Sequence, residues 1–448
     1  MKHPILIVAF LLLPLLAFSQ GVTFEQGSWK DALALAKQTD KPVLLYIYYS
    51  VDNWNREVFS RETVGDACNT YFVCYKMDAS KKEGLALAKK YGLTKRSVVL
   101  FVNADGTLLS IYGGVLGGAT GFIEAAKDVL LDLRSPKPMK AWEAEYPKRK
   151  KESAFLLEYI DKRMNLGLPI NVAFDAYLRL LPANDPMPVK AVQLFQLNRS
   201  GLMATEYPFQ YFLANRKAYF ETLVIIGGGR YYEDYRIFQD IVDHTIYVAT
   251  MNEDEALLKM AIAAFQQIPY DSDNKQVEEL YMDYYEEMKQ PDKYLDHARL
   301  FMADNLKKLD SEELLMKNNS MVKRFEERIA LETDTAEISG LKEIIKRQPE
   351  LARSRLCDKI YNIARIVCNT FSDASILEEA LSWSDKVVQV SPKTTFYLDT
   401  NAHILYKLGR KEEAVAMEKW AVANFQGSPT YTRFTDTLKK MEAGEKFW

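Results

Sequence analysis

The stretch that decides the N-terminal fold is KPVLLYIYYSVDNWNREVFS, residues 41–60. Its apolar run over residues 43–48 is dense and β-prone, which is typical of a strand covered on both faces. A helical pattern resumes at Val58 and Phe59. The loop between them, residues 51–55, contains no cysteine. The stretch therefore predicts a buried strand, a short loop and a helix.

The residues around this stretch predict a mixed α/β domain over residues 21–134. The expected elements, in chain order, are a helix opening at 28–31 and ending at 39–42, a strand over 43–48, a helix beginning at 59–64, a strand over 72–77, a helix over 85–92, strands over 98–102 and 107–112, and a helix over 121–133. Apolar periodicity indicates each element, and residues 103–106, NADG, are a hairpin turn signal. This order of strands and helices predicts a three-layer sandwich.

Several short stretches of this domain resemble the secreted thioredoxin-like family. They are GSWKDAL at 27–33, KPV at 41–43, EVFS at 57–60, LAKKYGL at 87–93 and VLFVNADG at 99–106. The region that they span is about a quarter of the chain. The resemblance implies a thioredoxin-like fold for residues 21–134.

The chain departs from the redox members of that family at two positions. Those members carry Trp-Cys-x-x-Cys after the first buried strand, where one thiol attacks the substrate and the other resolves the mixed disulfide. Here the loop before Val58 lacks both sulfurs and is about four residues shorter than that pattern. The family's cis-proline position aligns with Ser97, and because a non-proline cis bond costs about 3–4 kcal/mol, we expect a trans peptide there. The resemblance therefore implies a thioredoxin-like fold that lacks the redox chemistry of the family.

The remodelled loop offers a candidate peptide groove. By analogy with the family, Trp54, Tyr49, Arg96 and Ser97, with Tyr48 beside them, are expected to form an aromatic and basic ledge for an extended peptide. Core or rim packing of Trp54 and Tyr48 is the alternative interpretation.

The cysteines do not replace the missing motif. Cys68 and Cys74 lie near a helix end and in the next strand, and neither position offers the electropositive setting or helix N-terminus that a reactive thiolate needs. Buried small side chains or a structural disulfide between them are the two interpretations. Cys357 and Cys368, if on one helix, are roughly 16 Å apart, beyond disulfide reach. Packing explains them.

The first residues predict export. Lys2 and His3 are basic, residues 5–16 are apolar, and residues 17–19 present small side chains for cleavage before Gln20, so residues 1–19 read as a signal peptide. The apolar run is short for a membrane span, although an uncleaved signal anchor is the alternative. We expect a periplasmic or secreted protein with no membrane span after cleavage.

Composition limits the remaining classes of partner. At 448 residues the chain is long enough for two or three domains. Its hydrophobic content of 48% is ordinary for a globular protein. The formal net charge of −3 supplies no overall attraction for nucleic acid, so we expect no nucleic-acid partner.

The rest of the chain reads as helical. Residues 135–152, with Pro136 and Pro138, are expected to be a linker, and their basic cluster at 148–151 is interpreted as a solvated helix start, with anionic-surface binding as the alternative. From there apolar residues recur with a period of 3.6, which predicts a helical-hairpin region over residues 153–350.

A repeat is visible near the C-terminus. EEAL at 378–381 and EEAV at 412–415 are 34 residues apart, the tetratricopeptide period. Residues 361–390 and 396–425 resemble tetratricopeptide repeats, and residues 351–445 are expected to form a repeat array of this kind. The resemblance implies that a protein or peptide partner binds its concave face.

The remaining polar motifs predict no cofactor or metal. His244, His297 and His403 have no His or Cys partner at ligand spacing, so we interpret them as structural. The glycines at 227–229 lie between helical patterns and indicate a helix–helix turn instead of a nucleotide loop.

Three functional hypotheses follow from these patterns. The favoured one is an exported, non-catalytic binding protein that joins a thioredoxin-like domain to tetratricopeptide-like helices. The rival is an atypical thiol-disulfide oxidoreductase or isomerase of the cell envelope, which requires an accessible thiol of low pKa. The third is a purely structural scaffold.

Overall fold

A computed structural model describes most of the chain. It covers residues 21–49, 55–93, 97–113, 118–181, 187–226, 233–267, 276–311, 322–323, 325–330, 335–347, 351–425, 427 and 432–446. The chain divides into two compact units, Met1–Ala264 and Phe265–Trp448. The predicted signal peptide, Trp54 and Arg96 lie outside the described residues.

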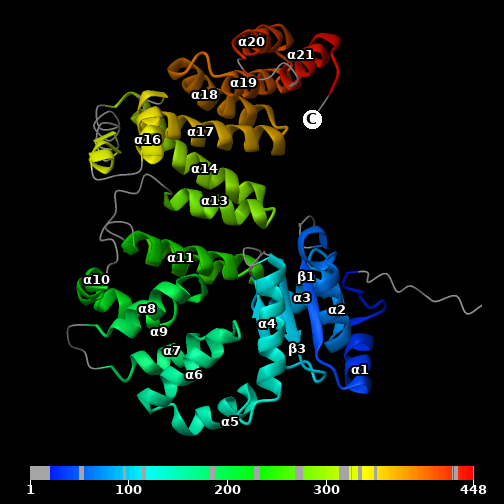
Figure 1. Ribbon diagram of the computed structural model, residues 1–448. Helices are drawn as coiled ribbons and strands as arrows, with labels where there is room; N and C mark the ends of the chain where they lie inside the picture. The colour runs from blue at the N-terminus through cyan, green and yellow to red at the C-terminus, as the bar shows by residue number, and fades with distance from the viewer. Residues whose placement is uncertain are drawn as a thin grey trace, which may run out of the picture. The chain divides into compact units, whose positions relative to one another are not determined.

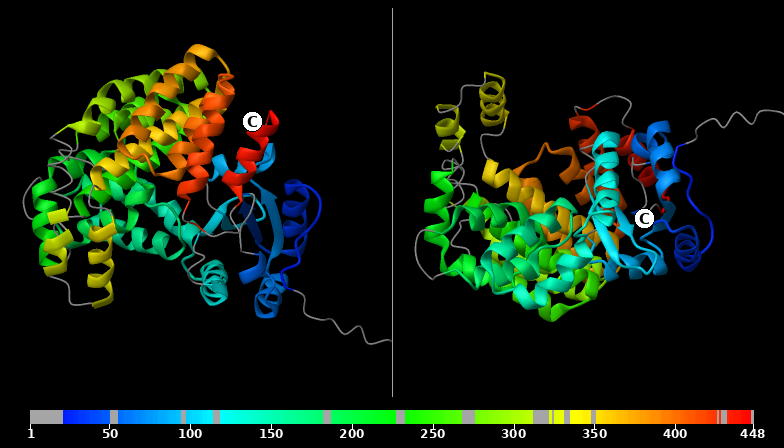
Figure 2. Two further views of the ribbon diagram at one scale, coloured as in Figure 1. Left: turned by 90° about the horizontal axis from the view of Figure 1, so that it is seen from above. Right: turned by 60° about the horizontal axis from the view of Figure 1, so that its bottom comes forward.

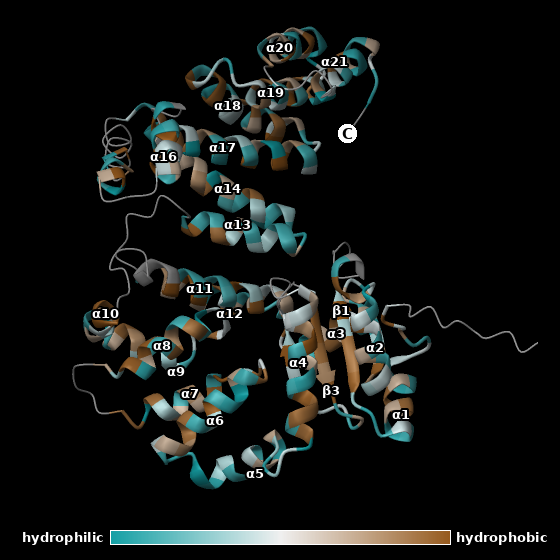
Figure 3. Ribbon diagram, viewed as in Figure 1, coloured by the Kyte–Doolittle hydropathy of each residue, from teal (hydrophilic) through white to brown (hydrophobic). Residues whose placement is uncertain are grey.

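A four-stranded sheet lies in the N-terminal part of the first unit. Its strands are β1 (Val43–Tyr48), β2 (Val73–Asp78), β3 (Val98–Val102) and β4 (Leu108–Tyr112). The order across the sheet is β2-β1-β3-β4, with β1 parallel to β2 and antiparallel to β3. β3 and β4 form the predicted hairpin. Figure 3 shows the apolar character of the two central strands, β1 and β3, which the dense apolar runs of the sequence predicted.

Helices cover both faces of this sheet (Figure 1). They are α1 (Trp29–Thr39), α2 (Glu62–Tyr71), α3 (Lys82–Lys90) and α4 (Gly118–Leu133). Because alternate strand residues point to opposite faces, Leu45 and Ile47 join a core with α1 and α3, whereas Leu44 and Tyr46 join a core with α2 and α4. Tyr46 is fully buried, which stabilises the fold by roughly 1.5–3 kcal/mol. The order of elements matches the sequence prediction.

The segment after the sheet contains a helix where a linker was expected. α5 (Met139–Arg149) lies within residues 135–152. The basic cluster was interpreted as a helix start, and this is wrong: Lys148 and Arg149 form the last turn of α5. The physical reason is that cations are favoured at the C-terminal end of a helix.

Asp132 in α4 fixes α5 and the next helix to α4. Its Oδ2 accepts a hydrogen bond of 2.9 Å from the main-chain N–H of Met139. Its Oδ1 lies 2.5 Å from the Nζ of Lys162. Asp132 is buried, so both contacts are shielded from water, and one carboxylate joins three consecutive helices.

Seven α-helices follow α5 in the described part of the first unit, and the last of them, α12, ends one residue past its boundary. They are α6 (Ser153–Asn165), α7 (Asn171–Leu178), α8 (Val189–Asn198), α9 (Tyr207–Ala214), α10 (Arg216–Ile225), α11 (Glu233–Asn252) and α12 (Glu255–Phe265). Aromatic rings run through their core, with centroids 4.8 Å apart for Phe174 and Phe195, 5.7 Å for Phe195 and Phe212, and 5.4 Å for Phe212 and Phe238. Such pairs add stability beyond the area that they bury.

The turn between α6 and α7 protects the edge of the sheet. The N–H of Ile111 in edge strand β4 donates to the carbonyl of Leu166, at 3.2 Å. Gly167 has a φ of +62°, and a Cβ at this position would lie 2.1 Å from the carbonyl oxygen of Ile111. The approach therefore requires glycine. Covering an edge strand in this way prevents it from pairing with another chain.

The second unit is helical throughout its described part. Its longer helices are α13 (Val277–Glu287), α14 (Pro291–Asn305), α16 (Thr335–Arg347), α17 (Leu351–Thr370), α18 (Ala374–Val390), α19 (Thr395–Lys407), α20 (Lys411–Asn424) and α21 (Arg433–Ala443). Each of α17 to α20 packs on the next. Figure 2 shows this C-terminal region as helices coloured from orange to red. Ala380 in α18 and Ala414 in α20 are both fully buried, so the 34-residue spacing corresponds to a repeated packing position.

None of the described helices combines the length and the apolar composition needed to cross a bilayer.

Candidate functional site

Two of the four predicted groove residues lie within the described structure, and they are in contact. The main-chain N–H of Tyr49 donates to the Oγ of Ser97, at 3.3 Å. This contact brings the end of β1 next to the start of β3, the two halves of the predicted groove. Tyr48 stacks on Tyr46, with ring centroids 5.5 Å apart, which favours the packing interpretation for Tyr48.

Helix α11 covers the Tyr49 side of this groove. The hydroxyl of Tyr247 donates to the carbonyl of Leu93, at 2.7 Å. Burial, followed by the neighbouring Tyr49, raises the pKa of Tyr247 well above its ordinary value. The hydroxyl of Tyr49 is itself buried, and burial raises its pKa. Both phenols are therefore neutral, and Tyr49 packs against the protein's own helix.

The thiols near the sheet are poorly suited to redox chemistry. Cys68 and Cys74 are both free and buried. Contact with Cys68, followed by burial, raises the pKa of Cys74 well above its ordinary value. Since the thiolate is the nucleophile, Cys74 is unreactive near neutral pH. The structure agrees with their interpretation as buried small side chains, and a disulfide between them stays a prediction.

The cysteines of the second unit are likewise packed. Cys357 and Cys368 are buried free thiols in α17. Burial raises the pKa of Cys368 to about 11, so its thiol stays protonated.

A cavity of about 450 Å³ lies beside Tyr247 in the first unit. Residues from the end of α3, from the α6–α7 turn and from α11 line it. His244 of α11 faces this cavity, and burial lowers its pKa. Its imidazole is therefore neutral at pH 7. Asn171 lines this cavity and also the larger cleft described next.

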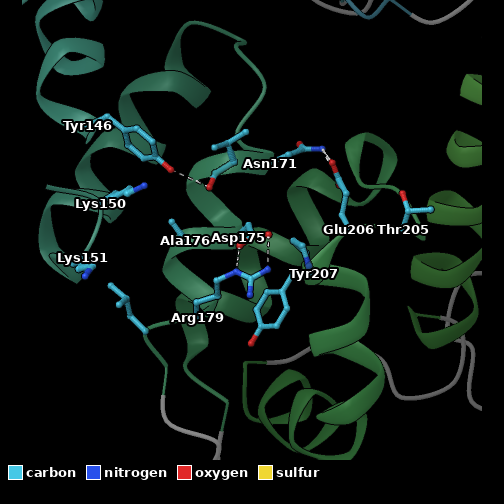
Figure 4. A pocket seen from close by; sticks show the side chains of 13 residues that line it. Tyr146, Lys150, Lys151, Asn171, Asp175, Ala176, Arg179, Thr205, Glu206 and Tyr207 are labelled. Atoms are coloured by element: carbon cyan, nitrogen blue, oxygen red, sulfur yellow. Dashed lines mark hydrogen bonds and ion pairs between the residues drawn. The ribbon is translucent and has the colours of Figure 1, made fainter. Parts of the chain in front are cut away.

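The larger cleft has a volume of about 690 Å³ and is shown in Figure 4. Three segments line it, and we call it the α7 cleft. The lining residues are Tyr146, Lys150, Lys151, Asn171, Val172, Asp175, Ala176, Arg179, Leu180, Thr205, Glu206, Tyr207 and Pro208. Helix α7 forms its floor, between the end of α5 and the turn before α9. This volume lies within the range of ordinary ligand pockets.

Three apolar side chains follow one line along the α7 cleft. Val172 and Ala176 are four residues apart on α7, the spacing that places side chains on one helix face, and Leu180 lies in the turn after α7. All three line the cleft. Val172 is 73% exposed and Leu180 is 39% exposed. The described part of the first unit leaves this apolar line uncovered.

An ion pair stacked on an aromatic ring forms one wall of the α7 cleft. The guanidinium of Arg179 donates from Nε and from Nη2 to the two carboxylate oxygens of Asp175, the second at 3.2 Å. The same guanidinium lies 3.8 Å from the ring centroid of Tyr207. A two-point ion pair on an aromatic face holds a flexible side chain in one position. Figure 4 shows the three side chains together.

A hydrogen-bonded amide and carboxylate form the opposite end. Nδ2 of Asn171 donates to the carbonyl of Gly201, at 2.6 Å, and to the carboxylate of Glu206, at 3.1 Å. The N–H of Met203 also donates to Glu206, at 3.0 Å. Asn198 donates to Oδ1 of Asn171, at 3.2 Å. The polar groups at this end of the α7 cleft satisfy one another.

Lys150 and Lys151 line the α7 cleft at the end of α5. Both are exposed, and neither makes an ion pair within the residues that the structure describes. The sequence identified these lysines only as part of a solvated basic cluster. The signal that connects them to a site is the exposed Val172 on the opposite helix, and the tertiary structure alone supplies that connection.

The histidines of the second unit have acidic or main-chain neighbours. Nδ1 of His297 lies 2.6 Å from a carboxylate oxygen of Glu278, and the ring of Tyr281 stacks on it at 4.3 Å. Nδ1 of His403 contacts the carbonyl of Asp399, at 2.7 Å. Among the described residues no group of three His, Cys, Asp or Glu side chains is placed to hold a metal ion.

A buried pair of acids lies in the C-terminal helices of the second unit. Glu418 in α20 is fully buried, and neither of its carboxylate oxygens has a hydrogen-bond partner in the described structure. Asp399 in α19 is also buried, and Arg433 of α21 lies 2.7 Å from its Oδ2. Burial, followed by the charge of Asp399, raises the pKa of Glu418 to about 8. Glu418 is thus mostly protonated at neutral pH.

Comparison with known proteins provides no function that can be assigned to this chain. No protein-family model and no curated protein matches the chain. Among solved structures, the chain is similar to the tetratricopeptide domain of P58(IPK), at 14% identity and a TM-score of 0.18, over 72% of this chain and 98% of that one. The assignment of packed helical repeats rests on the contacts within this chain.

Proposed function

We propose that this protein is an exported, non-redox binding protein that holds a peptide or a protein segment in the α7 cleft. In this proposal residues 21–134 are a thioredoxin-like domain, as the mixed sheet with helices on both faces and the sequence resemblance support. Residues 351–445 are a tetratricopeptide-like array that offers a further partner surface. The sequence features of residues 1–19 support export to the periplasm or beyond.

The uncovered apolar line on α7 is the observation that carries this proposal. A soluble chain normally buries aliphatic side chains that share one helix face, yet Val172 is 73% exposed. Beside it stand polar side chains that other residues of the cleft hold in position, Arg179 by its ion pair with Asp175 and Asn171 by its bond to Glu206. An apolar line with a few oriented polar groups is the usual composition of a peptide groove.

The rival, a thiol-disulfide exchange enzyme, lacks a comparable observation. Its nucleophile would need exposure and a low pKa, whereas Cys68 and Cys74 are buried and the pKa of Cys74 is raised. The groove residue Tyr49 packs against Tyr247 of α11. These features support recognition in the helical part over chemistry at the sheet.

The test is peptide binding by the full mature chain. We would screen an array of fluorescent 12-residue peptides by anisotropy and repeat the hits with Val172→Arg. We expect this substitution to weaken binding at least tenfold. Ile225→Arg is the matched control, because Ile225 is an aliphatic residue of the same unit that is 75% exposed and lies outside the cleft. Equal binding by both variants, or no hit from the array, would contradict the proposal.

A further inference from the structure

The charges of the α7 cleft are unequally compensated. Its two carboxylates are both engaged: Asp175 receives the guanidinium of Arg179, and Glu206 receives N–H groups from Asn171 and Met203. The two lysines at the end of α5 have no ion-pair partner within the described part of the chain. The cleft therefore has a positive excess, although the whole chain carries a net charge of −3.

We infer that the occupant of the α7 cleft is an acidic peptide segment, whose carboxylates pair with Lys150 and Lys151 while an aliphatic side chain packs on Val172 and Leu180. This inference rests on the proposed function and names the chemistry of its ligand. Charge complementarity selects the partner, since a basic segment would meet unpaired lysines at this end of the cleft.

The geometry assigns the two kinds of contact to different walls. The lysines lie at the end of α5 (Figure 4). The apolar line comes from α7 and the turn after it. An extended segment lying along α7 thus presents one side chain to the apolar line and another to the lysines, because successive side chains of an extended chain alternate in direction.

The ion pair of Arg179 and Asp175 leaves little charge on the wall near Tyr207. Arg179 uses its donors on Asp175 and its face on the Tyr207 ring. The charges of Arg179 and Asp175 cancel, so this wall has almost no net charge. The carboxylates of the ligand are consequently directed toward Lys150 and Lys151, which sets the orientation of the segment.

The test compares two labelled 12-residue peptides by fluorescence anisotropy with the full mature chain. They have the same Leu and Val positions, and the intervening positions are Glu and Asp in one and Gln and Asn in the other. We expect the acidic peptide to bind at least tenfold more tightly at low salt and to lose most of this advantage at about 0.5 M salt, where screening is short-ranged.

Substitutions within one basic cluster provide the control. Lys150→Glu and Lys151→Glu should each weaken binding of the acidic peptide severalfold and leave the neutral peptide unchanged. Lys148→Glu makes the same charge change in the last turn of α5, outside the cleft, and should have little effect. Equal losses in all three variants would overturn the inference, because they would indicate a long-range charge effect without a site.

Further outcomes separate this inference from the proposed function. If both peptides bind equally and Val172→Arg weakens both, the cleft binds peptides and the acidic preference is wrong. If neither binds, both proposals fail. Binding to vesicles containing anionic lipid, lost in Lys150→Glu and retained in Lys148→Glu, together with no acidic-peptide binding, would replace the peptide by an anionic surface.

Discussion

The hydroxyl of Tyr247 in α11 donates to the main-chain carbonyl of Leu93 after α3, at 2.7 Å, and so joins residues 154 positions apart in the chain. The same tyrosine lies against Tyr49 at the end of β1. One side chain from the helical region therefore covers the part of the sheet where the sequence predicted a peptide groove. The α7 cleft lies elsewhere in the first unit, and none of its lining residues belongs to the sheet.

Tyr247→Phe should destabilise the first unit by about 0.5–1.5 kcal/mol, the usual contribution of one hydrogen bond. The ring would still pack on Tyr49, so the loss reports the contacts of the hydroxyl, which are its bond to Leu93 and its interaction with Tyr49. Urea unfolding monitors the change. Tyr71→Phe is the control, because Tyr71 is 47% exposed, and a comparable loss there would contradict the role assigned to Tyr247.

Gly167→Ala should cost more than Gly92→Ala, although the two glycines have nearly equal φ angles of +62° and +63°. A Cβ at Gly167 would lie 2.1 Å from the carbonyl oxygen of Ile111, whereas a Cβ at Gly92 meets nothing within 4 Å. The strain of a positive φ costs about 1–2 kcal/mol at either position. The excess loss at Gly167, measured by urea unfolding, reports the contact with β4. Equal losses would show that the turn moves away without cost.

Glu418→Gln should flatten the dependence of second-unit stability on pH. The pKa of Glu418 is about 8 in the folded chain, against an ordinary value of 4.5, so folding favours its protonated form. Its contribution to stability is complete below about pH 4.5 and is lost as the pH rises to 8. This shift amounts to roughly 4–5 kcal/mol, as an upper value.

The measurement is chemical unfolding of wild type and Glu418→Gln between pH 5 and 9. The groups that face Glu418, Asp399 and Arg433 with His403 beside them, are unchanged in both proteins. Their own titration therefore cancels to first order in the difference. A difference in stability that stays constant across this range would exclude a raised pKa at Glu418.

The native protein should contain no fast-reacting thiol near neutral pH. Cys68 and Cys74 are buried and the pKa of Cys74 is raised, and the pKa of Cys368 is about 11. Titration with a thiol-reactive probe across pH should show rapid reaction only after unfolding. A fast phase at pH 7 that Cys68→Ser or Cys74→Ser abolishes would favour the oxidoreductase hypothesis.

The state of these two cysteines in the native protein has its own test. Mass spectrometry of the protein, alkylated without reduction, distinguishes two thiols from a disulfide. The two thiols are in contact in the structure, and both are free there. A disulfide would fix α2 to β2 and would leave the prediction of a non-redox protein intact, provided that the bond is not exchanged with a substrate.

Much of the fold could be predicted because its signals are local. The buried run that became β1, the NADG turn between β3 and β4, and the Ser28 cap of α1 each depend on a few neighbouring residues. Ser28 accepts from the N–H of Asp31 while the carboxylate of Asp31 accepts from Ser28, at 2.9 Å. Such interactions join residues within one turn of the chain, so they can be predicted from the local sequence.

The α7 cleft could not be predicted in the same way. Its lysines, its apolar line and its stacked ion pair come from three segments of the chain. The periodicity of one segment does not indicate which other segment packs against it. The basic cluster was recognised but placed at a helix start, because the sequence does not fix whether a charged run ends one helix or begins the next. Trp54 and Arg96 lie outside the described residues, and their role in the groove stays a prediction.

The sequence by itself determined the elements of this protein: the mixed sheet of residues 43–112, the helices that follow, and the absence of the Cys-x-x-Cys motif. Only the tertiary structure decided which surfaces are covered and which are left open. Tyr247 covers the end of β1 and the α6–α7 turn covers β4, whereas Val172 on α7 remains exposed. The physical reason is the separation along the chain of the residues that interact. Elements arise from interactions over a few residues, but coverage depends on contacts between residues more than fifty positions apart.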